Sequence, residues 1–311
     1  MVHAGLDMKE IEALCSRIFG PGSGLRVARV AEGVSTYVFR VERAGEAFYL
    51  RVLPEEGASF APEVLAHRLL RERGVHVPEV VYWEHYNPAL DRSVMLTTEI
   101  KGHAIREGSE PGALRDVLVA AGHDLALANA IPVQHFGWVR RDRANVVRLE
   151  GEVASLREWL LVDLDKHLAL LLHHGFFPAR MIARIGSIVA AFPRFFDGDR
   201  AYLAHGDFDP THIYHDHGVY SGIIDWGEIR GTQPLYDLGH FSMDNGPMLP
   251  YVLEGYREVA QLPVDFEQRI HLASLFVAIG RLAGGLLKHP PRPAFAPYVD
   301  AVERAVSALS S

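Results

Sequence analysis

The chain has 311 residues, of which 49% are hydrophobic and 23% are charged. This length suits two lobes better than one core, and the apolar content is too high for a disordered chain. The net charge is −8 and no basic stripe is evident, which argues against nucleic acid as a partner. Cys15 is the single cysteine, so an internal disulfide and a cysteine-only zinc site are excluded.

Secretion and membrane insertion are not indicated by the sequence. The first residues lead into a helix start rather than a secretory signal. The most apolar stretch, residues 272–287, is interrupted by Arg281 and is too short to span a bilayer. We therefore expect a cytoplasmic protein without membrane contact, and the sequence leaves its oligomeric state open.

The first hundred residues contain one helix followed by short alternating strands. Asp7, with Glu10 three residues later, predicts the start of a helix that ends at the glycine-rich run 20–24. The third strand alternates cleanly, so that Arg51 points away from the face that carries Leu50. The predicted strands are residues 25–31, 36–41, 47–53, 79–83 and 93–100, with a helix at 63–73.

After the first hundred residues, helical patterns dominate. Ser155 and Glu158 form a capping box, which predicts one helix from there to His174. We predict an α+β protein with two lobes or domains. Residues 1–100 would form a small antiparallel β lobe with one key helix, and residues 101–311 a larger, mainly helical lobe.

The strongest chemical signal is the sequence AHGDFDPTHIY at residues 204–214, followed by GIIDWG at 222–227. A short hairpin between the two segments would bring their ends together. Asp207, His212 and Asp225 can therefore share one site. This set suits phosphoryl transfer, because one carboxylate can accept the proton of an attacking hydroxyl while another supplies the oxygen ligands that Mg²⁺ prefers.

The two motifs resemble those of the aminoglycoside phosphotransferase and choline kinase group, which shares the protein-kinase fold. The resemblance implies a two-lobed kinase-like fold, Asp207 as the catalytic base and Asp225 as the main Mg²⁺ ligand. His212 stands where the group usually has Asn, which is similar to macrolide kinases, and we expect it to bind the metal or to hydrogen-bond Asp207. Asp237 matches a family residue that braces the catalytic loop, and His205 is expected to shape that loop.

By the same resemblance, the β-rich lobe binds the nucleotide, ATP or GTP. The loop between the first two strands is expected over the phosphates, and backbone groups of the segment that crosses to the second lobe are expected at the adenine edge. Arg51 takes the place of the strand lysine of protein kinases, and Glu63 is its expected ion-pair partner. The predicted nucleotide-binding residues are Ser35, Thr36, Arg51, Glu63, Glu99 and Ile100.

These features predict a small-molecule kinase that uses Mg²⁺ and transfers the γ-phosphoryl of ATP or GTP to a hydroxyl of a small acceptor. Related enzymes act on aminoglycosides, macrolides, choline and other alcohols, so antibiotic resistance is one candidate role. Acidic residues such as Asp163 and Glu228 could favour a cationic acceptor or form a solvated surface. Two alternatives stay open: a non-catalytic nucleotide-binding module, suggested by Arg51 and His212, and a His/Asp metallohydrolase, suggested by the histidines within 205–217.

Overall fold

The computed structural model describes residues 6–20, 24–30, 36–106, 108–288 and 295–310. The chain divides into two compact units, each of which is described by itself. Unit 1 comprises Met1–Lys101 and Arg140–Leu149, and unit 2 comprises Gly102–Val139 and Glu150–Ser311. The first division lies beside the boundary expected at residue 100, whereas the return of Arg140–Leu149 to unit 1 was not expected.

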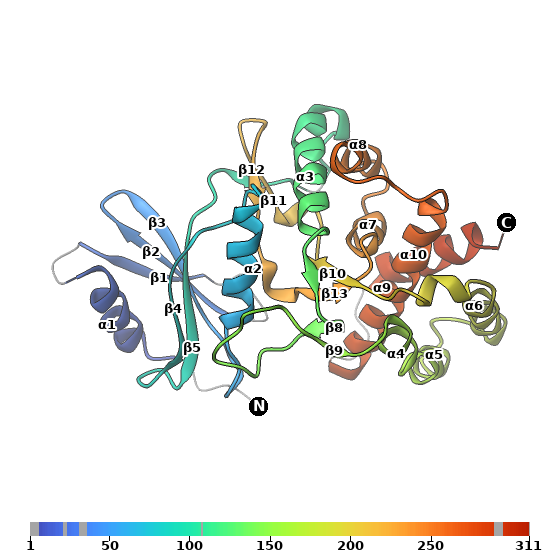
Figure 1. The fold of residues 1–311 in the computed structure, drawn as a ribbon, viewed down its shortest axis with the longest axis horizontal. Coiled ribbons are helices and arrows are strands. Elements are labelled where there is room, and N and C mark those ends of the chain that lie inside the picture. Colours follow the sequence, from blue (N-terminus) through green and yellow to red (C-terminus); the bar gives the residue numbers. More distant parts are fainter. Residues whose placement is uncertain (1–5, 21–23, 31–35, 107, 289–294, 311) are drawn as a thin grey trace. The chain divides into compact units, whose positions relative to one another are not determined.

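Unit 1 is built on a five-stranded antiparallel sheet with one helix on each face (Figure 1). The strand order is β1-β2-β3-β5-β4, so β3 pairs with β5 and every other pairing joins strands that are consecutive in sequence. The elements of unit 1 are α1 (Met8–Phe19), β1 (Arg26–Val30), β2 (Tyr37–Arg43), β3 (Glu46–Val52), α2 (Ala61–Glu72), β4 (Val80–Asn87) and β5 (Arg92–Thr98). This order confirms the predicted β-β-β-α-β-β arrangement after the first helix.

The two faces of this sheet carry different side chains because strand residues alternate. Helix α1 begins at Asp7, whose Oδ1 accepts the Lys9 N–H at 2.9 Å, and its apolar side packs on the face that carries Leu50. On β5, Met95 lies opposite Arg51 in the register and clusters with residues that lead into α2. Arg51 therefore lies on the α2 face of the sheet, away from Leu50, as predicted.

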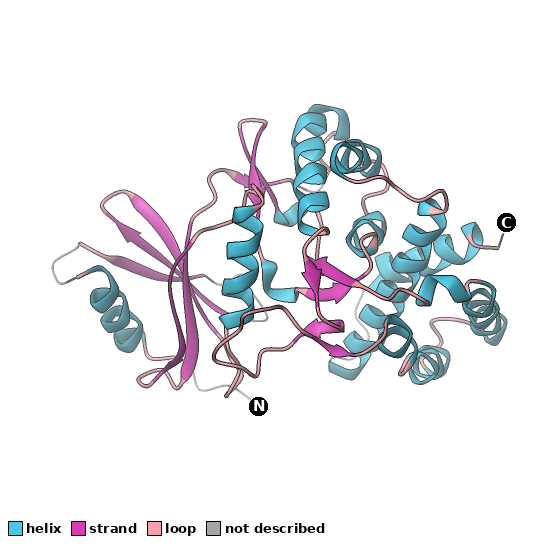
Figure 2. Cartoon of the chain, in the orientation of Figure 1, coloured by secondary structure: helices cyan, strands magenta, loops and turns pink. Residues whose placement is uncertain are grey.

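Unit 2 is mainly helical and contains two small sheets (Figure 2). Its strands form one five-stranded sheet in the order β7-β10-β13-β8-β9 and one three-stranded sheet in the order β12-β11-β6. The strands are β6 (His103–Ala104), β7 (Pro132–Val133), β8 (Phe136–Val139), β9 (Gly151–Val153), β10 (Ala201–Ala204), β11 (Ile213–Asp216), β12 (Val219–Ile223) and β13 (Arg230–Thr232). The α-helices are α3 (Arg115–Ala128), α4 (Leu156–Leu161), α5 (Leu164–His173), α6 (Ala179–Ala191), α7 (Tyr236–Ser242), α8 (Leu249–Val259), α9 (Phe266–Lys288) and α10 (Ala296–Ala308). Short 3₁₀ turns occur at Pro111–Leu114, Pro193–Phe196, Pro210–His212 and Trp226–Glu228.

The single helix predicted from Ser155 to His174 is two helices in the structure. The predicted cap is present, because Ser155 Oγ accepts the Glu158 N–H at 3.1 Å. However, α4 ends at Leu161 and α5 begins at Leu164. Local capping chemistry marks where a helix begins but not where it breaks, and leucines of both α4 and α5 contribute to the core of unit 2.

Helix α9 forms the centre of unit 2. It packs against α5, α7 and α10, and side chains such as Leu275, Ile279 and Leu282 are almost fully buried. The helix extends beyond the stretch 272–287 to which the sequence drew attention, and by length and composition Phe266–Leu287 is sufficient to cross a membrane. Burial within the protein reaches 61% over its most apolar window, which is what the core helix of a globular unit requires.

Candidate active site

The loop that follows β10 is held in place by a buried carboxylate. Asp237, in the first turn of α7, accepts hydrogen bonds from the backbone N–H groups of His205 and Gly206, both at 2.9 Å. Asn129 Nδ2 donates to the same carboxylate at 3.0 Å. Because a buried carboxylate is stable only when such donors satisfy it, this network fixes the loop on α7. The bracing role expected of Asp237 is therefore present.

Gly206 determines how closely this loop approaches the start of β13. Its φ is +87°, and a Cβ at this position would lie 2.0 Å from the carbonyl oxygen of Glu228 and 2.6 Å from Arg230 Nε. Both the backbone conformation and the close contact therefore require glycine. As a result, the loop packs directly against Glu228 and Arg230.

His205 joins this loop to the segment before Asp225. Its Nε2 lies 2.8 Å from the carbonyl oxygen of Ile224, so Nε2 carries the proton and donates it. Its Nδ1 then accepts the Asp207 N–H at 3.3 Å, which assigns a neutral ring. Burial, together with the nearby His212, lowers the pKa of His205 and keeps that ring uncharged. His205 therefore shapes the loop by hydrogen bonds to backbone groups, as expected.

Asp207 lies on this loop as an ionised carboxylate. Arg281 Nη2 donates to its Oδ1 at 2.6 Å, and His240 Nε2 lies 3.2 Å from the same oxygen. Burial alone would raise the pKa of the Asp207 carboxyl, but the hydrogen bond from His240 and the charge of Arg281 hold that pKa well below its usual range. Asp207 is therefore in the form that can accept a proton.

The β11–β12 hairpin brings His212 and Asp225 together. Its turn has positive φ at His217 and Gly218, +49° and +83°, which is the type I′ conformation favoured in two-residue hairpins. At the open end, the Ile224 N–H donates to the His212 carbonyl at 3.0 Å. Asp225 follows in the left-handed region, with φ 59° and ψ 58°, which aspartate tolerates better than most residues.

The donor atoms of His212 and Asp225 fit a shared cation. His212 Nδ1 donates to the Asp207 carbonyl oxygen at 2.7 Å, so a neutral ring keeps its lone pair on Nε2. His212 Nε2 lies 3.8 Å from Asp225 Oδ2. Two ligands that are each about 2.1 Å from one cation lie roughly 3–4 Å apart, so this separation suits a metal between them. Burial would lower the pKa of His212, but the charges of Asp209, Asp225 and Asp207 raise it.

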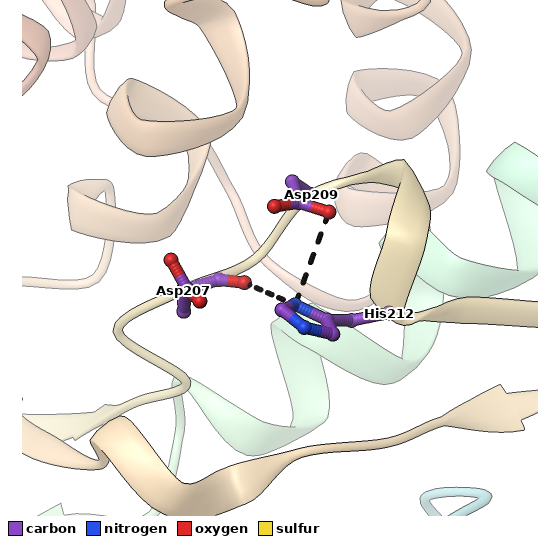
Figure 3. Close-up of side chains that lie close together, drawn as sticks. All are labelled: Asp207, Asp209 and His212. Carbon is purple, nitrogen blue, oxygen red and sulfur yellow. Dashed lines mark hydrogen bonds and ion pairs between the residues drawn. The ribbon is translucent and has the colours of Figure 1, made fainter. Parts of the chain in front are cut away.

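Asp209 has a local structural role. Its Oδ1 accepts the Thr211 N–H at 2.7 Å and the Thr211 hydroxyl at 2.5 Å, which caps the turn Pro210–His212. The same oxygen lies 3.9 Å from His212 Nδ1, and Figure 3 shows both aspartates beside this ring. The side chain therefore contributes negative charge to the site while it organises the loop.

The histidines of residues 205–217 do not converge on one metal. His215 is buried on β11, and its ring meets that of His103 edge to face with 4.4 Å between the ring centroids. His217 lies in the hairpin turn with 97% of its side chain exposed. Over the part of the chain that the structure describes, the group that could hold a metal is Asp207, Asp209 and His212. Two of its three members are carboxylates, a set that suits a hard cation better than zinc.

An arginine from α9, not assigned a role from sequence, completes the surroundings of Asp207. Arg281 Nη2 also donates to Glu228 Oε2 at 2.8 Å, and Arg230 Nη2 donates to that same oxygen at 3.0 Å. Arg230 is buried, with its guanidinium carbon 3.9 Å from the centre of the Trp138 ring. The sequence did contain one signal, because a charged residue within an apolar helix needs a buried partner.

In unit 1, the predicted partners Arg51 and Glu63 form an ion pair. Arg51 Nη1 donates to Glu63 Oε1, and the side chains are 12% and 0% exposed. Arg141 Nη2 lies 3.5 Å from Glu63 Oε2, so a second arginine shares this carboxylate. Arg141 was not predicted, because it belongs to the segment that returns to unit 1 from far along the chain.

The other predicted nucleotide contacts are only partly described. Ser35 lies outside the described residues, and Thr36 is half-buried in the bend before β2. The Glu99 N–H donates to the Ala47 carbonyl at 3.2 Å and is therefore engaged in unit 1. The expected adenine contact accordingly falls to the Glu99 carbonyl and the backbone of Ile100.

Comparison with known proteins gives a family match over most of the chain. The model of the APH phosphotransferase enzyme family matches residues 26–263, which include both motifs. A search of curated proteins found no match.

Several solved structures have the same fold at low sequence identity. A thermostable mutant of aminoglycoside phosphotransferase APH(4)-Ia, in ternary complex with ADP and hygromycin B, has a TM-score of 0.68 and 16% identity, covering 97% of this chain and 98% of its own. A fructosamine-3-kinase-like protein from Thermobifida fusca YX-ER1 has a TM-score of 0.66 and 18% identity, covering 96% and 99%. The chain therefore belongs to the APH phosphotransferase enzyme family, whose members are phosphotransferases of protein-kinase-like fold.

Proposed function

We propose that this protein is a Mg²⁺-dependent kinase that transfers the γ-phosphoryl of ATP, or of GTP, to a hydroxyl of a small acceptor. The observation that carries this proposal is the Asp207 carboxylate, which is ionised and is oriented by Arg281 and His240. The backbone carbonyl of Asp207 accepts from His212, whose other ring nitrogen lies 3.8 Å from Asp225. Nucleotide use is supported by a fold neighbour crystallised with ADP. We place the reaction in the cytoplasm, where nucleoside triphosphates are available.

Asp207 acts as the base toward the acceptor. Among the described residues, its hydrogen-bonding partners Arg281 and His240 both approach Oδ1, so Oδ2 takes the proton of the acceptor hydroxyl. The acceptor oxygen forms a bond to the γ-phosphorus while the bond from that phosphorus to the β,γ-bridging oxygen breaks, giving the nucleoside diphosphate. A carboxylate with a lowered pKa is a weak base, which is adequate because phosphoryl transfer depends chiefly on positioning and charge stabilisation.

The metal and the nucleotide are assigned to the other predicted residues. Asp225 and His212 hold Mg²⁺, which when bound spreads the negative charge of the phosphates. Arg51 contacts those phosphates, and Glu63 fixes the direction of its guanidinium group. Ser35 and Thr36 bind phosphate oxygens, while Glu99 and Ile100 bind the adenine edge through their backbones. Unit 1 is therefore the proposed nucleotide-binding part, and unit 2 carries the base and the acceptor.

The acceptor is proposed to be a polyhydroxylated small molecule, with aminoglycosides and macrolides as the leading candidates. Hygromycin B is bound in one fold neighbour, and another is fructosamine-3-kinase-like. Two of the acidic residues considered for binding a cationic acceptor are already paired within the protein. Glu228 is paired with Arg281 and Arg230, and Asp163 is paired with Lys166 at 2.8 Å. If the acceptor is an antibiotic, the enzyme confers resistance.

The test is nucleotide consumption in the presence of Mg²⁺, with ATP and GTP in parallel, against aminoglycosides, macrolides and small amino alcohols. We expect acceptor-stimulated turnover with at least one class, and turnover lower by about 100-fold or more with D207N. Nucleotide binding without turnover on the whole panel would favour a non-catalytic binding module, and turnover of a hydrolase substrate without nucleotide would contradict the proposal.

A further inference from the structure

The apolar core helix of unit 2 carries one charged side chain in its most apolar stretch. Between residues 272 and 287 the only charged residue is Arg281, and its helical neighbour Leu282 is fully buried. Placing a guanidinium group in such a helix costs free energy unless charged partners compensate it. The partners of Arg281 therefore indicate why an arginine stands there.

The Nη2 atom of Arg281 joins two carboxylates. It lies 2.6 Å from Asp207 Oδ1 and 2.8 Å from Glu228 Oε2, while Nη1 lies 3.4 Å from Glu228 Oε1. The three side chains are each about 30% exposed, so none of them is a freely solvated surface group. The same Glu228 Oε2 also accepts from Arg230, a buried residue stacked on Trp138. Arg281 is thus held in place by Glu228, which Arg230 also binds, and Arg281 in turn binds Asp207.

The contacts on Asp207 fix its rotation as well as its position. His240, on α7, lies 3.2 Å from the same Oδ1 that accepts from Arg281, on α9. The opposite ring nitrogen of His240, Nδ1, lies 3.1 Å from the Phe208 carbonyl, which prevents the ring from turning away. Two donors from two helices on one carboxylate oxygen leave Oδ2 directed away from both.

We propose that Arg281 is a positioning residue that holds Asp207 with Oδ2 presented to the acceptor hydroxyl. This role rests on the proposed function of Asp207 as the base. Arg281 itself neither gains nor loses a proton during the reaction, because a guanidinium group stays charged throughout. Glu228 transmits the support of Arg230 to Arg281, so that three residues from β13, α9 and the turn before β13 determine how Asp207 lies.

The experiment compares R281Q with R269Q, a matched control on the same helix. Arg269 is also paired with an aspartate, with Nε 2.9 Å from Asp265 Oδ1, and its side chain is 29% exposed against 30% for Arg281. We expect R281Q to lower kcat on the order of 10- to 100-fold, since a small misplacement of the base is costly, and to change KM for the nucleotide less than about twofold. R269Q should leave both constants unchanged.

Chemical rescue distinguishes positioning from a purely structural role. Added guanidinium at about 10 mM should restore part of the kcat of R281A, a concentration that lowers the free energy of unfolding by less than about 0.1 kcal/mol. The inference is overturned if R281Q turns over like the wild type. It is also overturned if R281Q loses activity only in parallel with its Tm and guanidinium has no effect on R281A.

A crystal structure of R281Q tests the geometry without any turnover. We expect the Asp207 carboxylate to be rotated or split between two orientations. A carboxylate in the same orientation as in the wild type would contradict the inference. Failure of the proposed function is a separate result, because it would appear as a wild-type protein without acceptor-dependent turnover while the effect of Arg281 on Asp207 could still be seen in the crystal.

Discussion

Each unit contains a partly buried cluster of arginines and carboxylates, and the two clusters differ in their balance of charge. In unit 1, Arg51 and Arg141 share the single carboxylate of Glu63. In unit 2, Arg281 lies between two carboxylates, those of Asp207 and Glu228. The first cluster has more positive groups than negative ones. In the second, Arg281 and Arg230 are matched by two carboxylates, and the carboxylates of Asp209 and Asp225 lie near the neighbouring His212.

This difference matches what each part of a phosphotransferase must bind. A site for nucleotide phosphates needs excess positive charge. A buried glutamate can hold the cationic side chains in a fixed direction. A site for a divalent metal and a departing proton needs excess negative charge, with enough positive charge nearby to keep the base ionised. The comparison predicts that substitutions in the two clusters change different kinetic constants.

The largest expected effect is that of D207N. This change keeps the shape of the side chain but removes the proton acceptor, so kcat should fall on the order of 10²–10⁴-fold. Nucleotide affinity, measured by calorimetry with a non-hydrolysable analogue, should stay within about threefold of the wild type. Near-normal kcat would exclude Asp207 as the base, and a large loss of nucleotide affinity would show that the two clusters are not functionally separate.

A smaller effect of the opposite kind is expected for R51M. Methionine keeps much of the side-chain length and removes the charge, so KM for the nucleotide should rise about 10- to 100-fold while kcat changes much less. E63Q is the matched test of the support, and it should shift KM in the same direction by a smaller factor because the charge of Arg51 stays while its carboxylate partner is lost. Steady-state kinetics at saturating acceptor measures both constants. A fall in kcat with an unchanged KM would break the comparison.

How well these clusters could be predicted from the sequence depended on how far apart their residues lie along the chain. Arg51 and Glu63 are 12 residues apart on a strand and the next helix, and their contact was predicted from the kinase resemblance because this strand and helix come in the expected order. The alternation in β3 and the capping at Asp7 are local features. Asp207, His212 and Asp225 were predicted to meet because one short hairpin links them, and the structure brings their loops together.

The residues that were missed come from distant segments. Arg281 lies 74 residues after Asp207, and Arg141 lies 78 residues after Glu63. Neither contact follows from periodicity or spacing, since each depends on how whole helices or segments pack. The sequence did show one anomaly, a single arginine in an apolar helix. Such a residue indicates a buried partner but does not identify it.

A modest pH effect is expected for metal binding at His212. Burial would lower the pKa of this ring, but the charges of Asp209, Asp225 and Asp207 raise it above its ordinary value. A metal on Nε2 must displace the proton, so Mn²⁺ affinity should weaken as pH falls through that raised pKa, by at most about tenfold per pH unit. H212N should bind Mn²⁺ with affinity nearly independent of pH between about 6 and 8, because Asn does not titrate.

His217 provides the control for this experiment. It lies in the hairpin turn, 97% exposed, with Nε2 3.7 Å from Asp216 Oδ1. H217N should reproduce the wild-type dependence on pH when Mn²⁺ binding is followed by titration calorimetry. If H212N kept the wild-type pH dependence, His212 would not be a ligand, and Asp225 would bind the metal without it.

The smallest expected effect is a difference in stability between the two units. Cys15, in unit 1, is buried, and burial together with the charge of Glu12 raises the pKa of its thiol to about 11. At pH 8 only about 0.1% would be thiolate, so labelling should be very slow until unit 1 opens. The folded protein keeps this proton to higher pH than the unfolded chain does, so the stability that it contributes is lost as pH rises from about 9 to about 11.

Unit 2 has its own reporter, because Trp226 is fully buried there and W83F removes the tryptophan of unit 1. Unit 1 is the smaller of the two and buries the smaller apolar core. We therefore expect Cys15 of W83F to be labelled in urea at a concentration lower than the fluorescence midpoint, by up to about 1 M. Coincident transitions would mean that both units unfold as one cooperative structure. A substitution in either cluster should then destabilise both units. The separate effects on KM and kcat would in that case have to come from the chemistry of the two clusters alone.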